Sequence, residues 1–166
     1  MKKKLNIVIL TVSDTRNPKT DKSGEVLKNK ILDSHHNLFE KKICKDNKME
    51  IKNILNVWLK KKNINVIIAT GGTGLTKRDI TPEVFKSFFE KDIPGFGEIF
   101  RMLSYKKIKT STIQSRACAG ISNGKYLFSL PGSPSACKDA WDKIIKYQLD
   151  SSFKPCNLVE ILPKLN

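Results

Sequence analysis

Three aspartates stand just beyond segments that the sequence predicts to be strands. Asp14 follows the apolar run 5–12, Asp46 follows the run 39–44, and Asp79 comes shortly after the run 66–70. Because the carboxyl ends of parallel strands meet at one edge of a sheet, we expect these carboxylates to lie near one another. Carboxylates are ligands for Mg²⁺, although a single aspartate in such a place equally serves as a turn or capping residue.

A glycine-rich stretch, Gly71-Gly72-Thr73-Gly74, separates the third of these runs from Asp79. Glycine frees the backbone from the usual φ limits, so successive N–H groups can gather around an anion. The spacing fits neither a Walker A loop nor a dinucleotide-binding loop, since Lys77 stands where a further glycine is needed. Two interpretations stay open, an anion-binding loop and a tight strand-to-helix connection that holds no ligand.

Two helix starts are predicted close to this chemistry. Thr81 is expected to cap a helix that carries Pro82 in its first turn, and Ser133 is expected to cap a helix that begins at Pro134. Lys77 and Arg78 supply positive charge, which is suited to binding phosphate groups. Ser13, Ser115 and Ser133 are poor candidates for a nucleophile, because the only histidines, His35 and His36, are expected to be exposed at the opposite edge.

The elements that must position these residues alternate between strands and helices. The strands are expected at 5–12, 39–44 and 66–70, followed by a hairpin of 117–121 and 125–130 with Asn123-Gly124 in its turn. Helices with apolar stripes are expected between the strands, including one that carries Val84, Phe85, Phe88 and Phe89. The pattern predicts an α/β three-layer sandwich with a mostly parallel central sheet plus an antiparallel hairpin.

We expect residues 1–166 to form a single domain with 152–166 as a C-terminal tail. The apolar residues of that tail leave two possibilities, packing on the body of the chain or on a neighbouring subunit. No apolar run approaches the roughly 20 residues that a membrane span needs, and we expect a cytoplasmic protein with no membrane partner.

The formal net charge of +15 invites a nucleic-acid interpretation. Only four of the 31 basic residues are arginine, whose guanidinium group forms bidentate hydrogen bonds to phosphates and bases. The lysines are spread along the chain without interleaved aromatic residues. This distribution argues against nucleic acid as a partner. It still favours attraction of small anionic molecules.

Taken together, these residues resemble the MoaB/MogA family of molybdenum cofactor biosynthesis proteins. The resemblance spans nearly the whole chain, and it is most specific in the segment from Thr70 to Glu83. The other matching stretches are Thr11-Val12-Ser13-Asp14-Thr15-Arg16, Lys45-Asp46, Pro94-Gly95-Phe96-Gly97-Glu98, Arg101-Met102-Leu103-Ser104, Ser115-Arg116-Ala117, Leu130-Pro131-Gly132-Ser133 and Lys154-Pro155-Cys156-Asn157.

The resemblance implies a molybdopterin-binding domain, and in active members it implies adenylylation of molybdopterin by Mg-ATP with release of pyrophosphate. Asp46 and Asp79 would be the essential acids and would hold Mg²⁺. The implied substrate-binding residues are Ser13, Asp14, Gly71, Gly72, Thr73, Gly74, Arg78, Thr81, Ser115, Pro131, Gly132 and Ser133. The family also implies a homo-oligomer, a trimer in MogA-like members and a hexamer in MoaB-like ones.

Three functions therefore stay open. The first is a molybdopterin adenylyltransferase, and the second is a molybdopterin-binding accessory protein without catalysis, as some members of the MoaB branch are. The third, a basic nucleic-acid-binding module, comes from a different class of protein. The acids and glycines of the matching stretches do not separate the first two.

Overall fold

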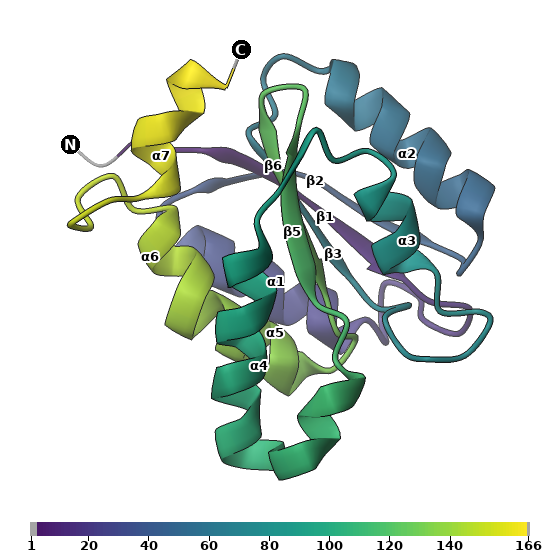
Figure 1. Ribbon diagram of the computed structural model, residues 1–166. Helices are drawn as coiled ribbons and strands as arrows, with labels where there is room; N and C mark the ends of the chain where they lie inside the picture. Colours follow the sequence, from purple (N-terminus) through teal and green to yellow (C-terminus); the bar gives the residue numbers. More distant parts are fainter. Residues whose placement is uncertain (1–2, 166) are drawn as a thin grey trace.

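A computed structural model describes residues 3–165 of the chain. Its centre is a six-stranded sheet with the order β2-β1-β3-β6-β5-β4, and helices cover both faces of the sheet (Figure 1). The predicted α/β sandwich is confirmed.

Four neighbouring strands of this sheet are parallel. They are β2 (Asn37–Cys44), β1 (Asn6–Val12), β3 (Val66–Thr70) and β6 (Lys125–Leu130). The register pairs Thr70 with Thr11 on one side and with Leu130 on the other, so these strands end together. The turns that follow them are therefore brought to one edge of the sheet.

An antiparallel hairpin extends the sheet. Strand β5 (Cys118–Ser122) pairs with β6, and the two-residue strand β4 (Lys91–Asp92), which was not predicted, pairs with β5. Asn123 and Gly124 have φ angles of 45° and 67°. Two successive positive φ angles are what a tight hairpin turn of this kind requires, so the Asn-Gly prediction is confirmed.

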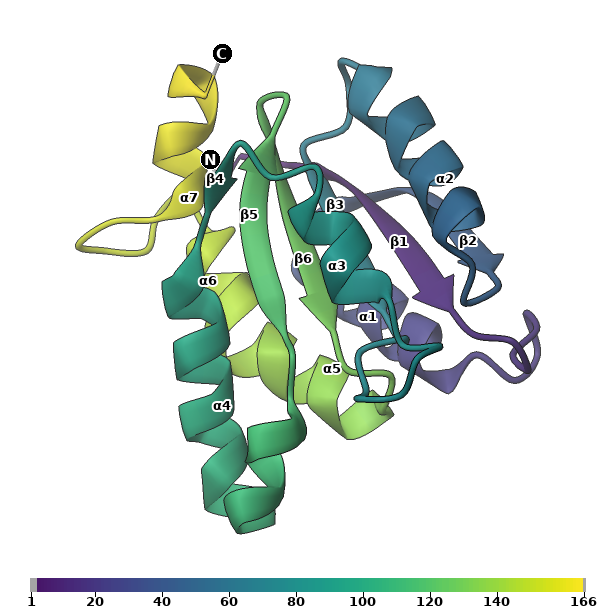
Figure 2. The same cartoon turned by 45° about the vertical axis from the view of Figure 1, so that its right-hand side comes forward.

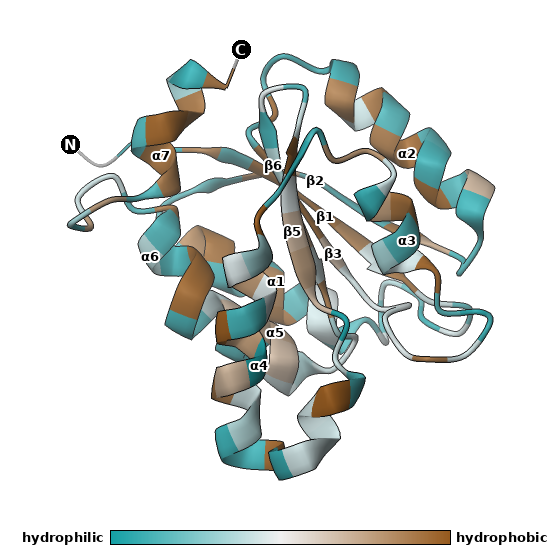
Figure 3. Ribbon diagram, in the orientation of Figure 1, coloured by the Kyte–Doolittle hydropathy of each residue, from teal (hydrophilic) through white to brown (hydrophobic). Residues whose placement is uncertain are grey.

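The two faces of the sheet carry separate hydrophobic cores, because side chains alternate along each strand. Ile7, Ile9 and Ile68 face α1 (Lys22–Asp33), α4 (Pro94–Ile108) and α5 (Pro134–Ala140), with the turns η2 (Trp141–Ile145) and α6 (Lys146–Gln148) continuing α5. Val8, Leu10 and Ile67 face α2 (Lys48–Lys60) and α3 (Thr81–Lys86). Figure 3 shows hydrophobic residues along the central strands and polar ones on the outer helix surfaces.

The C-terminal tail packs on the body of its own chain. It forms α7 (Leu158–Ile161) and the 3-10 turn η3 (Leu162–Lys164), and both Val159 and Leu162 are buried in the hydrophobic core that also contains Ile7 and Ile9. The Tyr126 hydroxyl donates a 2.8 Å hydrogen bond to the carbonyl oxygen of Leu158. Of the two possibilities for the tail, the structure has the first.

Three local predictions were wrong. Thr81 does not cap α3, because the capping residue is Ile80 and makes no side-chain cap. The same helix ends at Lys86, before Phe88 and Phe89. His36 is buried rather than exposed, and its Nδ1 accepts a hydrogen bond from the backbone N–H of Leu5.

Within residues 3–165, no helix combines the length and the apolar character that crossing a membrane would require.

Candidate functional site

Two turns meet beyond the carboxyl ends of β3 and β6. The backbone N–H of Gly71 donates to the Leu130 carbonyl at 3.0 Å, and the Thr70 hydroxyl donates to the Pro131 carbonyl at the same distance. Gly132 lies against Gly71, since a methyl group added at Gly132 would come within 3.2 Å of the Gly71 Cα. The glycine loop and the Pro131-Gly132-Ser133 turn therefore form one continuous wall, as the sequence predicted.

Ser133 has the capping role that its sequence context predicted. Its hydroxyl accepts a 3.1 Å hydrogen bond from the backbone N–H of Ala136, which fixes the start of α5. The turn before α5 is held in place by this bond.

Only glycine fits at two positions of the loop. Gly71 has a φ of 101°, and an added methyl group would lie 2.1 Å from the Val12 carbonyl oxygen. Gly72 has a φ of 62°, and a methyl group there would lie 2.3 Å from the Thr81 hydroxyl oxygen. The absence of side chains lets the loop backbone pass directly beside β1 and the start of α3.

Asp46 lies across from Gly72. A methyl group on Gly72 would come within 2.8 and 2.9 Å of its two carboxylate oxygens. Its Oδ1 is buried and has no hydrogen-bond partner among residues 3–165, and the same holds for the hydroxyl oxygen of Thr81. Burial, and then the neighbouring charge of Asp79, raise the pKa of Asp46 above its ordinary value. An unpaired carboxylate oxygen of this kind is suited to receive a cation or a ligand donor.

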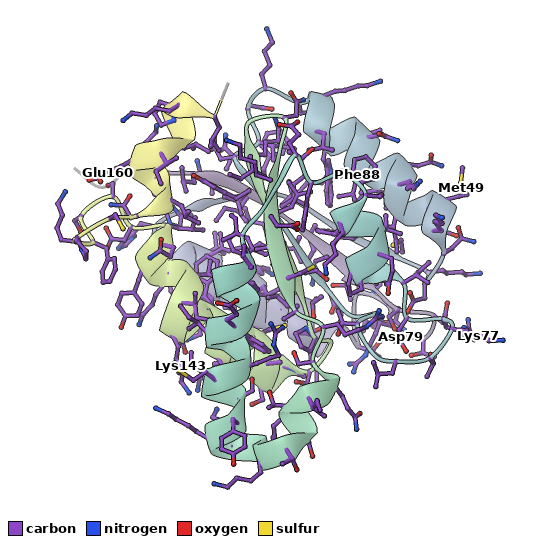
Figure 4. All side chains as sticks on the ribbon, in the orientation of Figure 1. Met49, Lys77, Asp79, Phe88, Lys143 and Glu160 are labelled. Atoms are coloured by element: carbon purple, nitrogen blue, oxygen red, sulfur yellow. The ribbon has the colours of Figure 1, made fainter. Side chains whose placement is uncertain are left out.

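Asp79 is held by its own loop. Its Oδ2 accepts hydrogen bonds from the Thr76 hydroxyl at 2.6 Å and from the Thr76 backbone N–H at 3.0 Å. These bonds, the Thr76 hydroxyl first, lower the pKa of Asp79, so the carboxyl stays ionised over a wide pH range. Figure 4 shows Lys77 pointing outward from the same loop, away from the body of the chain.

Asp14 brings the first strand's turn into contact with this site. Its Oδ1 accepts a 3.3 Å bond from the backbone N–H of Asp46, and its Oδ2 pairs with the guanidinium of Arg78. Ser13 holds the turn itself, since its hydroxyl accepts from the backbone N–H groups of Thr15 and Arg16. The Arg78 side chain is 73% exposed, so its ion pair with Asp14 adds little stability and leaves the guanidinium within reach of a ligand.

Arg116 holds the outer part of the glycine loop, a role that the sequence did not predict for it. Its guanidinium donates to the carbonyl oxygens of Thr73 at 3.2 Å and Asp79 at 2.6 Å, and it pairs with Glu83. Arginine suits this role because its rigid fork of donors reaches several acceptors at once. In the sequence, Arg116 belonged to the matching stretch Ser115-Arg116-Ala117, which assigned it no role.

We expect Arg116→Lys to loosen the segment from Thr73 to Asp79. A lysine ammonium cannot reach three acceptors in the guanidinium's geometry, so the free energy of unfolding should fall by about 1–3 kcal/mol. Amide hydrogen exchange of Thr73, Gly74 and Asp79 would report the change directly. Arg16→Lys is the matched control, because Arg16 is exposed and its side chain donates only to Thr20. Equal exchange rates in both variants would contradict the role of Arg116.

A cleft of 620 Å³ adjoins the loop beside Arg116. It lies between α3, α4 and the start of β5, and its lining includes Ser115. The hydroxyl oxygen of Ser115 is buried and has no hydrogen-bond partner in the part of the chain that the structure describes. A second cleft, of 690 Å³, begins at Ser13 and Asp14 and runs along β2 to Glu50. The glycine loop, Asp46 and Asp79 line neither cleft and lie between the residues that line them.

The donors present suit Mg²⁺ only in partnership with a ligand. Residues 3–165 contain no group of three or more histidine, cysteine or acidic side chains placed to hold a metal ion. Mg²⁺ is commonly bound by one or two carboxylates together with substrate phosphates and water. The unpaired Asp46 oxygen and the ionised Asp79 beside it fit that kind of site.

Comparison with known proteins gives a consistent family. Residues 8–151 match the family described as a probable molybdopterin binding domain. Molybdenum cofactor biosynthesis protein B from Escherichia coli strain K12 is 43% identical over 158 residues, which cover 95% of this chain and 93% of that protein. The protein of the same name from Bacillus cereus is 40% identical over 148 residues, covering 89% and 88%.

Solved structures agree with this assignment. The crystal structure of a molybdenum cofactor biosynthesis protein B has a TM-score of 0.88 at 37% identity, covering 98% of this chain and 96% of that one. The tungsten cofactor synthesizing protein MoaB from Pyrococcus furiosus has a TM-score of 0.82 at 34% identity, covering 98% of both chains.

Proposed function

Because the chain belongs to the molybdopterin-binding family of molybdenum cofactor biosynthesis protein B, we propose that it binds molybdopterin and adenylylates it with Mg-ATP, releasing pyrophosphate. The observation that carries the proposal is the unpaired, buried Oδ1 of Asp46. This oxygen lies so close to Gly72 that a methyl group there would come within 2.8 Å of it. A buried carboxylate oxygen without a hydrogen-bond partner lowers the stability of the folded protein, and this supports a role for Asp46 in binding a ligand.

The glycine loop, Arg78 and the cleft beside Ser115 would bind different parts of the substrates. The backbone N–H groups of Gly72 and Thr73 are suited to phosphate oxygens. The N–H of Gly74, by contrast, already donates to the Asp79 carboxylate. Arg78, which is exposed, adds positive charge on the same side. The cleft beside Ser115 is large enough for a fused-ring pterin, and the unpaired Ser115 hydroxyl provides it with a polar contact.

The reaction transfers an adenylyl group, and it depends on positioning of the two substrates. An oxygen of the molybdopterin terminal phosphate attacks the α-phosphorus of ATP, a new P–O bond forms, and the bond to the pyrophosphate oxygen breaks. Mg²⁺, held by Asp46 and Asp79, would neutralise charge on the phosphates. The chain's own contribution is to hold the two phosphates close together and in line, because there is little covalent chemistry for the protein to perform.

An assay with purified protein, molybdopterin, ATP and Mg²⁺ tests this function. We expect adenylylated molybdopterin and pyrophosphate from the wild type, and a loss on the order of 10²-fold or more for Asp79→Asn. Asp142→Asn is the matched control, since Asp142 pairs only with Lys30 at a distance from the loop. If correctly folded wild-type protein forms no product, the chain is not an adenylyltransferase. If Asp79→Asn turns over as fast as the wild type, Asp79 does not hold the metal ion.

A non-catalytic molybdopterin-binding protein is the second candidate, and one observation favours it. Asp79 is already engaged by Thr76, and Asp14 is already paired with Arg78, so two of the three acids have partners within the chain. If molybdopterin binds with micromolar or better affinity while no adenylylated product forms, this second function replaces the first.

We also propose that the chain assembles as a trimer or hexamer. Large apolar side chains are exposed along α4 and the adjoining 3-10 helix η1 (Lys109–Gln114), which together project from the sheet (Figure 2). They are Ile99, Met102, Tyr105, Ile108 and Ile113. Contact with another copy would remove this surface from water. A monomeric mass by analytical ultracentrifugation at assay concentration would contradict the assembly.

A further inference from the structure

A cavity of 610 Å³ lies at the opposite end of the sheet from the candidate site. It is formed where the β5–β6 hairpin, the end of α2 and the C-terminal turn η3 come together (Figure 1). Four lysines line it, Lys3, Lys60, Lys62 and Lys125, and no acidic residue does. We refer to it as the lysine cavity.

Lys125 makes this more than a group of surface lysines. The residue is only 5% exposed, and among the described residues its ammonium donates to a single acceptor, the Asn123 carbonyl oxygen at 3.2 Å. Burial without an acidic partner lowers the pKa of Lys125. A buried ammonium has three donors, so a position with one acceptor leaves hydrogen-bonding capacity directed at whatever fills the cavity.

The other three lysines are also without acidic partners. Within residues 3–165, none of Lys3, Lys60, Lys62 and Lys125 takes part in an ion pair. The adjacent Lys61, by contrast, pairs with Glu40 at 3.2 Å. Glu90 accepts a 2.7 Å hydrogen bond from the backbone N–H of Asn123, and within the described residues it forms no ion pair with these lysines. The four positive charges around the cavity repel each other, and the attraction of each to a multivalent anion bound between them would offset this repulsion.

We propose that the lysine cavity is a second binding site, which takes a compact phosphate anion of several charges, such as a polyphosphate chain. Lysine is a common phosphate binder that acts as a point charge, so it suits a flexible polyphosphate better than a planar carboxylate. The concave shape favours a compact ligand over an extended strand of nucleic acid. The site is independent of the proposed adenylylation, because it lies at the other edge of the sheet.

Nuclear magnetic resonance of ¹⁵N-labelled protein tests the proposal at residue resolution. Inorganic tripolyphosphate is added at about 150 mM salt with a chelator and without Mg²⁺. We expect saturable shifts of the Asn65, Gly124 and Lys125 amide signals. The double variant Lys60→Gln/Lys62→Gln should weaken binding about tenfold, since it removes two of four charges from exposed positions and leaves the core unchanged. Lys125→Met should weaken it similarly.

The control is the double variant Lys106→Gln/Lys138→Gln, which lowers the net charge equally at exposed positions of α4 and α5. It should leave the affinity unchanged. Equal losses in the two double variants would show a general charge effect, and shifts confined to Gly71 and Gly74 would place the anion in the candidate site. A random oligonucleotide that shifts Gly124 at lower concentration than tripolyphosphate would make nucleic acid the ligand. Each of these three results would overturn the proposal.

Discussion

Asp46→Asn should abolish adenylylation and at the same time make the folded protein more stable at neutral pH. Burial and the charge of Asp79 both disfavour the ionised carboxyl, whose Oδ1 has no hydrogen-bond partner. Asparagine has nearly the same shape and carries no charge, so both costs are relieved. Because solvent screens this partly buried group, we expect a gain of about 0.5 kcal/mol in the free energy of unfolding. Turnover should fall on the order of 10²-fold or more, since a neutral amide is a poor ligand for Mg²⁺.

The pH dependence of this gain has a definite sign. The pKa of Asp46 is raised in the folded state above its ordinary value of 3.8, so between those two values the native protein holds more protons than the unfolded chain. Stability from this group therefore falls as the pH rises through that window. The advantage of Asp46→Asn over the wild type should be present at pH 7 and should disappear as the pH is lowered through the raised pKa towards 3.8.

Urea unfolding of both proteins across this pH range measures the effect, and Asp79→Asn provides the contrast. Its carboxylate is stabilised by hydrogen bonds from Thr76, so the same substitution there should lower stability at neutral pH. A loss of stability in Asp46→Asn as large as that in Asp79→Asn would mean that the hydrogen bond from the Ile80 backbone N–H gives Asp46 a structural role, and that Asp46 is not held ready for a ligand.

Gly71→Ala should have the largest effect on stability among single substitutions in the glycine loop. The added methyl group would lie 2.1 Å from the Val12 carbonyl oxygen, a backbone atom that cannot rotate away, and the φ of 101° is strained for any L-residue. We expect a loss of about 3–5 kcal/mol in the free energy of unfolding, from the strained backbone and the overpacking together. Chemical denaturation, followed by circular dichroism, would measure it.

Gly95→Ala is the matched control for that experiment. Gly95 lies in the first turn of α4, where an added methyl group meets nothing within 4 Å. Alanine has the higher helix propensity and restricts the unfolded chain more, so stability should stay unchanged or rise by up to about 1 kcal/mol. If the two variants lose equal stability, close packing around Gly71 is not the cause.

The parts of the fold and site that the sequence predicted are those with local signals. The apolar runs at 66–70 and 125–130, the Asn123-Gly124 turn and the cap at Ser133 depend on residues within a few positions of each other. The closeness of Asp14, Asp46 and Asp79 was predicted by one further argument, that parallel strands end at the same edge of the sheet. The roles of those acids in binding and catalysis stay predictions.

The parts that were missed depend on contacts between distant segments. Thr81 resembles a cap, yet its hydroxyl faces Gly72 and Asp46, because the loop folds back across the start of α3. Lys41 interrupts the apolar run 39–44, and its neighbours in the sequence indicate no partner for it. In the structure it reaches the buried carboxylate of Asp21 at 3.0 Å, and Asp21 caps α1. Arg116 likewise finds its acceptors far away along the chain, and nothing in its immediate neighbours indicates them.

The end of β3 determines how the candidate site can respond to a ligand. The hydroxyl of Thr70 binds the Pro131 carbonyl and contacts the sulfur of Cys137 at 3.1 Å, while the next residue, Gly71, binds Leu130. Neither turn can therefore shift without the other, and both are fastened to a buried strand. A ligand would meet a surface that already has its final shape, so the protein would lose little conformational entropy on binding. Selectivity between ligands would then come from how well each fits this surface and not from closure of a loop.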